Sequence, residues 1–182
     1  EEYFSRIPGV QDVTVGYANG ETKKPTYEQV CTGKTGYAEA VHVVYDPQRV
    51  SLKTLAEQFF KVIDPVSVNR QGNDRGSQYR TGMYYVQEAD KPILEAVIAA
   101  EQKKYTKAIV VELRPLANYY LAEEYHQDYL KKNPGGYCHI SFDSLAELPK
   151  EPPAAVVPAK YTKPEDAILR KTLTPQEYTV TQ

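Results

Sequence analysis

The sequence predicts an α+β fold, a two-layer split β-α-β (ferredoxin-like) sandwich in which helices cover one face of a mixed sheet. Apolar residues recur at helical spacing in residues 52–64 and alternate with other residues in 38–45. The expected elements follow one another as helix, strand, strand, helix, strand, helix, strand, which is the order of a split β-α-β arrangement. A length of 182 residues provides a core of ordinary size, with room for an appendage.

The first half of the chain supplies two strands and one core helix. Large apolar residues before Pro8-Gly9 share a helical face, so this segment is the end of a helix. Ser51 is the expected N-cap of the core helix, which should end at Asp64-Pro65. The expected elements are a helix ending near residue 7, strands at 10–17 and 38–45, a helical turn at 26–30 and the helix 52–64.

The second half alternates strands with helices until its composition changes near Phe142. Ile109, Val110 and Val111 are contiguous, which is typical of a central strand. Asn133-Pro134-Gly135-Gly136 should end the last helix. We expect a strand at 83–86, a helix at 92–105, a strand at 108–113 and a helix at 119–132, followed by an extended proline-rich linker and a short helix at 167–173.

A polar, glycine-punctuated loop at residues 69–79 lies between two of the expected core elements. Loops of this kind commonly direct side chains at a ligand. Asp74, Gln78 and Tyr79 are therefore candidate site residues. The alternative is a long solvated connection with a turn at Asn73-Asp74 or Arg75-Gly76, and composition alone does not separate the two interpretations.

Strand parity makes Glu39 a further candidate. Its side chain shares a face with Val41 and Val43, whereas His42 points to the opposite face. If the valine face is buried, desolvation raises the pKa of the Glu39 carboxyl, as a general acid near neutral pH requires. If the His42 face is the buried one, Glu39 is solvated and has no such role.

Composition excludes several classes of partner. The formal net charge is -2 and the basic residues are scattered, unlike those of a nucleic-acid-binding protein. No apolar run approaches the ~20 residues of a membrane span. Cys31 and Cys138 form neither a disulfide framework nor a zinc-ligand spacing. The three histidines, His42, His126 and His139, show no metal-binding spacing. We therefore expect no nucleic acid, membrane span, metal or cofactor.

Five motifs lie in register along residues 1 to 140. They are Gly16-Tyr17 with Pro25 to Cys31 (PTYEQVC), Thr35 to Val41 (TGYAEAV), Gln71 to Arg80, Tyr125 to Leu130 (YHQDYL) and Asn133 to Ile140 (NPGGYCHI). Together they closely resemble the peptide methionine sulfoxide reductases of the A type. Because the motifs are ordered and cover most of the chain, the resemblance is highly specific.

The resemblance implies a thiol-dependent oxidoreductase that reduces methionine S-sulfoxide, free or in proteins, to methionine. The family's nucleophile is a cysteine in a Gly-Cys-Phe-Trp-Gly motif at a helix N-terminus, a position that lowers the pKa of a thiol. We expect this motif a few residues before Glu1, in agreement with the missing helix start and the lack of Trp in the sequence. The chain as written would then lack the nucleophile of the first chemical step.

The resemblance also assigns roles to residues that are present. Glu39 would protonate the sulfoxide oxygen while the thiolate attacks sulfur. Tyr27 and Tyr79 would donate hydrogen bonds to that oxygen and bind the substrate. Asp74 would hold the loop of Tyr79 in place, and Tyr129 would contribute to substrate binding.

Both cysteines of the sequence fall within family motifs. Cys138 matches the family's resolving cysteine, which converts the sulfenic acid into a disulfide that thioredoxin or a similar reductant then reduces. Cys31 follows the helical turn and is expected to be a packed, inert thiol. Tyr37 stands where the family usually has His, and on parity it either tunes Glu39 or merely packs beside it.

The end of the chain resembles a second family. Leu169-Arg170, Leu173 to Gln176 and Tyr178 to Gln182 look like the opening of a B-type methionine sulfoxide reductase, which implies a covalently linked B domain in a bacterial A-B fusion. The expected organisation is an A-type domain at 1–142, the linker at 143–163 and the start of the B domain at 164–182. Localisation stays open between the bacterial cytoplasm and the cell envelope.

The sequence leaves two other functions to consider. A non-catalytic module that binds Met or Met sulfoxide through its tyrosines is the alternative if the missing nucleophile is a biological truncation. An unrelated thiol oxidoreductase should show a Cys-x-x-Cys motif, which this sequence lacks. The residues encoded upstream of Glu1 distinguish the enzyme from the binding module.

Overall fold

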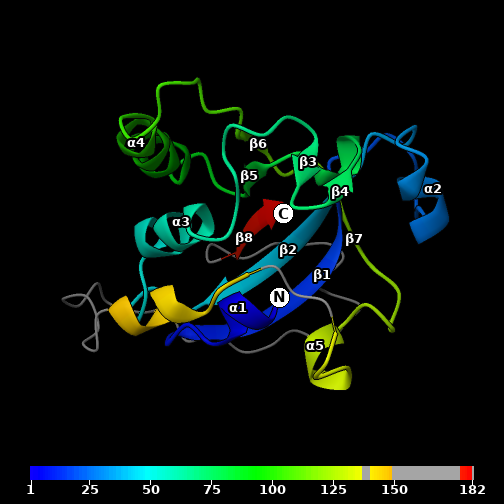
Figure 1. The fold of residues 1–182 in the computed structure, drawn as a ribbon, viewed down its shortest axis with the longest axis horizontal. Coiled ribbons are helices and arrows are strands. Elements are labelled where there is room, and N and C mark those ends of the chain that lie inside the picture. Colours follow the sequence, from blue (N-terminus) through cyan, green and yellow to red (C-terminus); the bar gives the residue numbers. More distant parts are fainter. Residues whose placement is uncertain (137–139, 149–176, 182) are drawn as a thin grey trace.

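A computed structural model describes residues 1–136, 140–148 and 177–181 (Figure 1). The described helices are α1 (Glu2–Ser5), α2 (Tyr27–Cys31), α3 (Leu52–Phe60), α4 (Lys91–Gln102) and α5 (Tyr129–Lys132), with the 3-10 helices η1 (Ser77–Tyr79) and η2 (Asp143–Glu147). The described strands are β1 (Val10–Ala18), β2 (Ala38–Tyr45), β3 (Arg70–Gln71), β4 (Asp74–Arg75), β5 (Gly82–Tyr85), β6 (Glu112–Pro115), β7 (Tyr119–Leu121) and β8 (Glu177–Thr181).

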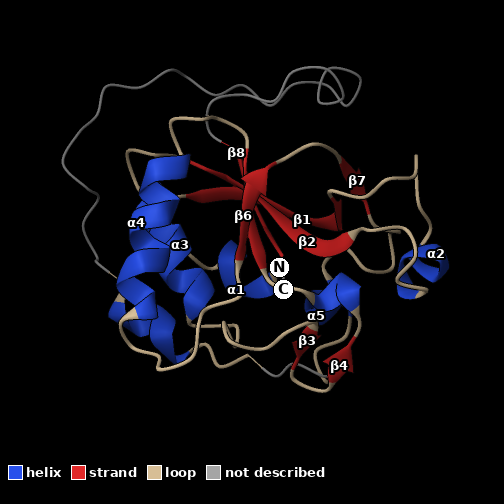
Figure 2. Ribbon diagram, turned by 90° about the horizontal axis from the view of Figure 1, so that it is seen from above, coloured by secondary structure: helices blue, strands red, loops and turns tan. Residues whose placement is uncertain are grey.

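The described strands form a six-stranded mixed sheet in the order β6-β5-β8-β2-β1-β7, beside a separate β3-β4 hairpin. β5 and β6 are parallel, and the other neighbours are antiparallel. Figures 1 and 2 show α3 and α4 together on one side of the sheet, and α2 at the far end, beside β7. The predicted two-layer α+β arrangement with a mixed sheet is confirmed.

The main core lies between the sheet and helices α1, α3 and α4. The helical spacing of Leu52, Leu55 and Phe59 predicted one apolar face for α3, and all three side chains are buried. The buried cluster consists of Tyr3, Phe4, Ile7, Val41, Val43, Tyr45, Val50, Leu52, Leu55, Ala56, Phe59, Phe60, Met83, Tyr85, Leu94 and Val97. Since Val41 and Val43 belong to it, the face of β2 that carries Glu39 is a buried face.

The opposite face of β2 is covered as well. Ala38 and Ala40 pack with Tyr84 in a second buried cluster, to which Tyr119 adds partly buried surface. The ring of His42 lies against Tyr119, with 5.4 Å between the ring centroids, and burial lowers the pKa of His42 to about 4. Strand parity alone allowed either face of β2 to be the buried one, and in the structure each is covered by a different part of the chain.

Two short helices begin where the sequence predicts. Thr26 and Gln29 form a capping box at the start of α2, in which each side chain hydrogen-bonds the other residue's backbone N–H. The Ser51 hydroxyl caps α3 by accepting from Thr54 N at 3.0 Å. These caps fix the position of α2, which carries Tyr27 as its first residue.

The predicted helix 119–132 is wrong for most of its length. Tyr119–Leu121 form β7 and pair with residues 16–18 of β1, and only Tyr129–Lys132 are helical. The reason lies in Gln127, whose amide accepts from Val15 N at 3.0 Å and donates to Val15 O at 2.9 Å. A side chain thus continues the pairing of β1 beyond β7, and no helical periodicity reveals such a contact.

The predicted strand 108–113 is displaced toward the C-terminus. Ile109 and Val111 pack against the main core, whereas Val110 is exposed and its N–H donates to Pro65 O at 2.8 Å. Residues 109–111 therefore lie alongside the loop after α3 instead of forming a strand. β6 begins only at Glu112 and lies at the edge of the sheet. α3 likewise ends at Phe60, four residues before the predicted boundary at Asp64.

The described segments nearest the C-terminus contact elements that lie much earlier in the sequence. Leu145 of η2 packs against the main core, and the Ser144 hydroxyl shares a 2.6 Å hydrogen bond with the hydroxyl of Tyr3. The backbone of β8 pairs antiparallel with both β2 and β5. The predicted helix 167–173 and residues 149–163 of the predicted linker lie outside the described residues. Among the described helices, none has the length and apolar character needed to cross a membrane.

A substitution at Gly16 tests how closely β7 approaches β1. A Cβ atom at Gly16 would lie 2.3 Å from Tyr120 O and 2.5 Å from the Tyr119 ring, so one of these groups would have to move. We expect Gly16→Ala to lower the free energy of unfolding by about 1–3 kcal/mol, measured by urea denaturation. Gly135→Ala is the control, because no described atom lies within 4 Å of the Cβ it would add. Equal urea midpoints for the two variants would contradict the close approach.

Candidate active site

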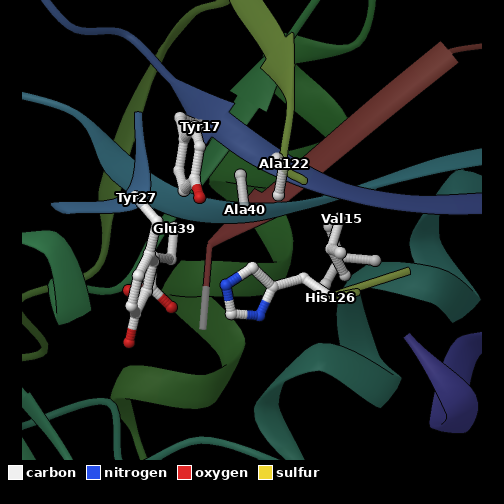
Figure 3. A pocket seen from close by; sticks show the side chains of 9 residues that line it. Val15, Tyr17, Tyr27, Glu39, Ala40, Ala122 and His126 are labelled. Atoms are coloured by element: carbon white, nitrogen blue, oxygen red, sulfur yellow. The ribbon is translucent and has the colours of Figure 1, made fainter. Parts of the chain in front are cut away.

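A cavity of about 130 Å³ opens where β1, β2, α2 and the segment after β7 meet. It is lined by Val15, Gly16, Tyr17, Tyr27, Glu39, Ala40, Val41, Ala122 and His126. Figure 3 shows the polar side chains of Tyr17, Tyr27, Glu39 and His126 around it. Since an apolar protein cavity of roughly 150 Å³ holds benzene, this one has room for a small organic side chain.

Glu39 supplies the carboxyl group of the cavity wall. Burial raises the pKa of this carboxyl from its ordinary 4.5 to about 7, and the charge of Asp74 acts in the same direction, whereas a hydrogen bond with Tyr79 lowers it. Its Oε1 atom is buried and has no hydrogen-bond partner among the described residues. A carboxyl with a pKa of about 7 keeps its proton in a large share of the molecules near neutral pH, and with one oxygen unpaired it can donate that proton to a bound ligand.

The register of β1 and β2 places Tyr17 directly opposite Glu39. The Tyr17 hydroxyl donates to Glu123 Oε2 at 2.6 Å, and Glu123 Oε1 accepts from the backbone N–H of Tyr27 at 2.8 Å. Burial, followed by the contact with Glu123, raises the pKa of Tyr17. Glu123 therefore connects the β1 wall of the cavity to the first residue of α2.

Tyr27 projects from α2 with its hydroxyl near Cys31. A hydrogen bond with Cys31, followed by burial, raises the pKa of Tyr27 to about 12, so the phenol stays protonated and able to donate at neutral pH. Cys31 is exposed, so the prediction of a packed thiol is wrong. α2 has only five residues and buries Val30, which leaves Cys31 on its outer side.

Tyr79 and Asp74 belong to the polar loop. The Tyr79 hydroxyl hydrogen-bonds with Glu39, and burial raises the pKa of Tyr79. Asp74 is exposed, and its charge raises the pKa of both Glu39 and Tyr79. The loop is not merely a solvated connection, because the buried amide of Gln71 bonds to both backbone groups of Asp64, at 3.1 and 3.4 Å.

His126 completes the cavity from the segment after β7. Its ring lies between Tyr27 and Tyr125, with centroid distances of 4.6 and 4.3 Å. Its Nε2 atom is buried and has no hydrogen-bond partner in the described part of the chain. The cavity wall thus contains a second polar atom that a ligand can satisfy.

The structure brings three of the candidate residues together and leaves others apart. Glu39 and Tyr27 line the cavity, and Tyr79, which is not a lining residue, interacts electrostatically with both. Tyr129 packs against Gly136, is 44% exposed and is not among the residues that line the cavity. Cys138 lies outside the described residues, so its role stays a prediction.

Two further residues near the site, Tyr37 and Gln78, point into the protein interior and not into the cavity. The Tyr37 hydroxyl donates to the carbonyl of Thr22, and its ring packs with Tyr120, which favours packing over tuning of Glu39. Gln78 is buried next to Gly76, and its Oε1 has no partner among the described residues. Gln78 therefore belongs to the interior of the polar loop.

Sequence reasoning did not assign Tyr17, Glu123 or His126 to the site. Tyr17 was expected only as the last residue of a strand, and the pairing register is what places it opposite Glu39. Glu123 and His126 were placed on a predicted helix, where their side chains would have had other directions. The signal that could have found them is the dense polar and aromatic composition of residues 123–127.

The chemistry available at the cavity follows from its groups. A neutral carboxyl, phenols with raised pKa values and an imidazole can bind a polar oxygen and deliver a proton to it. Within residues 1–136 and the other described segments, no three His, Cys, Asp or Glu side chains form a group that could hold a metal ion.

Comparisons with known proteins agree with this chemistry. The sequence model of the family described as peptide methionine sulfoxide reductase matches residues 1–152. Mxr1 from Saccharomyces cerevisiae, in its reduced form, is 41% identical with a TM-score of 0.69, over 71% of this chain and 75% of that chain. Methionine sulfoxide reductase A of Corynebacterium diphtheriae is 39% identical with a TM-score of 0.68, over 76% of this chain and 71% of that chain. An unusual oxidised form of Mxr1 is 38% identical with a TM-score of 0.52, over 73% of both chains.

With the family model covering most of its length and the A-type structures matching its fold, the chain belongs to the peptide methionine sulfoxide reductases of the A type.

Proposed function

We propose that the cavity reduces the S epimer of methionine sulfoxide, with Glu39 as general acid and with Tyr27 and Tyr79 as hydrogen-bond donors to the sulfoxide oxygen. A thiolate attacks the substrate sulfur while Glu39 protonates the oxygen. The attack forms a bond between the cysteine sulfur and the substrate sulfur. The protonated oxygen then passes from the substrate sulfur to the cysteine sulfur while the bond between the two sulfurs breaks, so that methionine leaves and the enzyme holds a cysteine sulfenic acid. The substrate gains the two electrons that the enzyme thiol loses.

The observation that carries this proposal is the state of Glu39. Its carboxyl has a pKa of about 7 because it is buried, and its unpaired Oε1 lies at the cavity. Below that pH the group holds the proton that the sulfoxide oxygen must receive. Two phenols that remain protonated flank it, and they stabilise the negative charge that develops on this oxygen.

We infer that the attacking thiolate belongs to residues N-terminal to α1, as the family resemblance implies. Support comes from Glu1, whose Oε1 accepts from Asp128 N at 2.8 Å. Asp128 follows His126 and Gln127 in the segment that closes the cavity. A residue that immediately precedes α1 would therefore emerge beside the cavity.

Cys138 is proposed as the resolving thiol. Residues on its C-terminal side are held on α1, where Phe142 packs against Tyr3 and beneath the Arg6 guanidinium, which lies 4.4 Å from the ring centroid. On its N-terminal side, Gly136 donates its N–H to Asn133 O at 2.8 Å. A disulfide with the nucleophile would require the two Cα atoms to come within about 7 Å of each other.

Recycling and domain context complete the proposal. A disulfide between nucleophile and resolving cysteine is a substrate for a dithiol reductant, so thioredoxin or a thioredoxin-like protein is the proposed electron donor. The proposed substrates are methionine sulfoxide residues in peptides and proteins. Residues 164–182 are proposed as the start of a B-type domain, after an A-type domain at 1–142 and a linker at 143–163. The backbone of residues 177–181 nevertheless pairs as β8 with β2 and β5 of the A-type domain.

Glu39→Gln tests the general acid in the full-length protein. The amide keeps the size of the side chain but has no proton to give, so we expect the single-turnover rate to fall by roughly 10²- to 10⁴-fold with a smaller change in substrate binding. The wild-type rate should decline as pH rises through about 7, where Glu39 loses its proton.

Glu28→Gln is the matched control, because Glu28 is an exposed residue of α2 and does not line the cavity. It should keep the wild-type rate and pH profile. A Glu39→Gln rate within a factor of a few of wild type would remove Glu39 from the acid role.

Epimer selectivity is tested by product analysis with resolved methionine sulfoxides. We expect turnover of the S epimer to require the nucleophile of the A-type domain, because the resemblance to the A-type family implies that preference. The R epimer should depend on the proposed B domain. S-epimer turnover that survives removal of the A-type nucleophile would overturn the assignment.

Cys138→Ser tests the resolving step. We expect the full-length variant to reduce about one equivalent of sulfoxide per enzyme and then to stop as sulfenic acid, because thioredoxin attacks a disulfide. Quench-flow measurement of methionine formed per enzyme gives this burst. Cys31→Ser should continue through multiple turnovers. Steady thioredoxin-dependent turnover of Cys138→Ser would move the resolving role to Cys31 or to another cysteine.

A further inference from the structure

Arg80 connects several parts of the site and has no role in the function derived above. It directly follows Tyr79 and ends the 3-10 helix η1. Its side chain is only 17% exposed, which is unusual for an arginine. A buried guanidinium is held in place by the groups that accept its hydrogen bonds.

The guanidinium of Arg80 binds three separate segments. Nη1 donates to Ser77 O at 3.0 Å, within η1 itself, and Nη2 donates to Gly36 O at 2.9 Å. Nε donates to Glu112 Oε2 at 3.2 Å, at the start of β6. The same carboxylate oxygen accepts from the Tyr84 hydroxyl at 3.0 Å, which anchors it to β5.

These contacts control the spacing between Glu39 and Tyr79, whose side chains share a hydrogen bond. Gly36 lies three residues before Glu39 in the chain, and Arg80 is the neighbour of Tyr79. A single planar group therefore fixes the backbone near Glu39 relative to the backbone near Tyr79. The charge of Arg80 faces Glu112 and is offset there, so Arg80 acts on the site through geometry.

We propose that Arg80 is a positioning residue that holds the Tyr79 hydroxyl against the Glu39 carboxyl, which deepens the function proposed above and rests on it. Lysine keeps the charge, but its single ammonium cannot reach three acceptors that diverge from a planar fork. In Arg80→Lys the η1 helix should move away from the turn at Gly36. The hydrogen bond between Tyr79 and Glu39 should then lengthen or break.

The first test measures the Glu39 carboxyl by ¹³C NMR titration and needs no turnover. Tyr79 lowers the pKa of Glu39, so its displacement should raise that pKa by about 0.5 to 1 unit, the range that an ordinary hydrogen bond corresponds to. The other groups that face Glu39 are Asp74 on β4, Tyr27 on α2, Tyr17 on β1 and His126 after β7, and they are the same in both proteins. An unchanged titration in folded Arg80→Lys would overturn the proposal.

The matched control is Arg114→Lys. Arg114 also approaches the Glu112 carboxylate, at 4.0 Å, but it is 66% exposed and belongs to β6, away from η1. Its replacement should leave the Glu39 titration as in wild type. A shift of equal size in both variants would mean that the Glu112 carboxylate, and not the guanidinium of Arg80, determines the result.

The second test is a double-mutant cycle in the full-length protein. We expect Arg80→Lys to lower kcat for sulfoxide reduction about tenfold and to move the alkaline limb of the pH profile to higher pH. In a Tyr79→Phe background it should cause little further loss, because its effect passes through the Tyr79 hydroxyl. Additive losses would show that Arg80 acts elsewhere and would also overturn the proposal.

Two further measurements separate a loss of positioning from a loss of folding, and the role of Arg80 from the acid role of Glu39. Circular dichroism and thermal unfolding establish that each variant is folded, and if Arg80→Lys is not, Glu112→Gln replaces it. That variant weakens one of the three contacts, so the Glu39 pKa should rise by a smaller amount, and no rise would count against the proposal. If Glu39→Gln were fully active while the NMR shift was present, the acid role would fail and the positioning by Arg80 would stand.

Discussion

The active site depends on one strand, β1, which pairs with β2 on one edge and with β7 on the other. The first pairing sets Tyr17 opposite Glu39, and the second brings the segment with Glu123 and His126 to the same end of the sheet. Backbone hydrogen bonds are directional and their register has a period of two, so a shift by one residue would turn each side chain to the other face. The chemistry of the cavity is thus determined by the register of the sheet.

The same pairing imposes a cost on the folded protein. A carboxyl whose pKa rises from 4.5 to about 7 on folding binds its proton more tightly in the native state than in the unfolded chain. Its stabilising contribution is complete below pH 4.5 and is lost as the pH rises through about 7. The buried position that equips Glu39 to deliver a proton therefore makes the protein less stable at neutral and alkaline pH. The buried position of Glu39 is therefore explained by its role in proton transfer and not by a contribution to stability.

Sequence patterns identified those parts of the fold that depend on local periodicity. The alternation in β2, the apolar face of α3, its cap at Ser51 and the helical turn after Pro25 were all readable, because each concerns residues within a few positions of one another. β7 was not readable, since its partner strand lies about a hundred positions earlier and its continuation is a side-chain contact of Gln127. The candidates Glu39, Tyr27 and Tyr79 came from parity and motif, whereas Glu123 and Arg80 act through contacts that only the folded chain reveals.

The hydrogen bond between Tyr3 and Ser144 has a consequence for the order in which the protein is assembled. It joins residues 141 positions apart, and such non-local contacts form slowly because the intervening chain must first be ordered. As a chain emerges from the ribosome, the β1–β2 hairpin has all its residues once Tyr45 has been made, whereas the contact between α1 and η2 must wait until Ser144 has been made. The wall made by residues 122–127 also arrives late. A nascent chain therefore holds Glu39 in an open, solvated environment, where its carboxyl is an ordinary acid, and the proton donor comes into existence only when the last third of the domain closes over it.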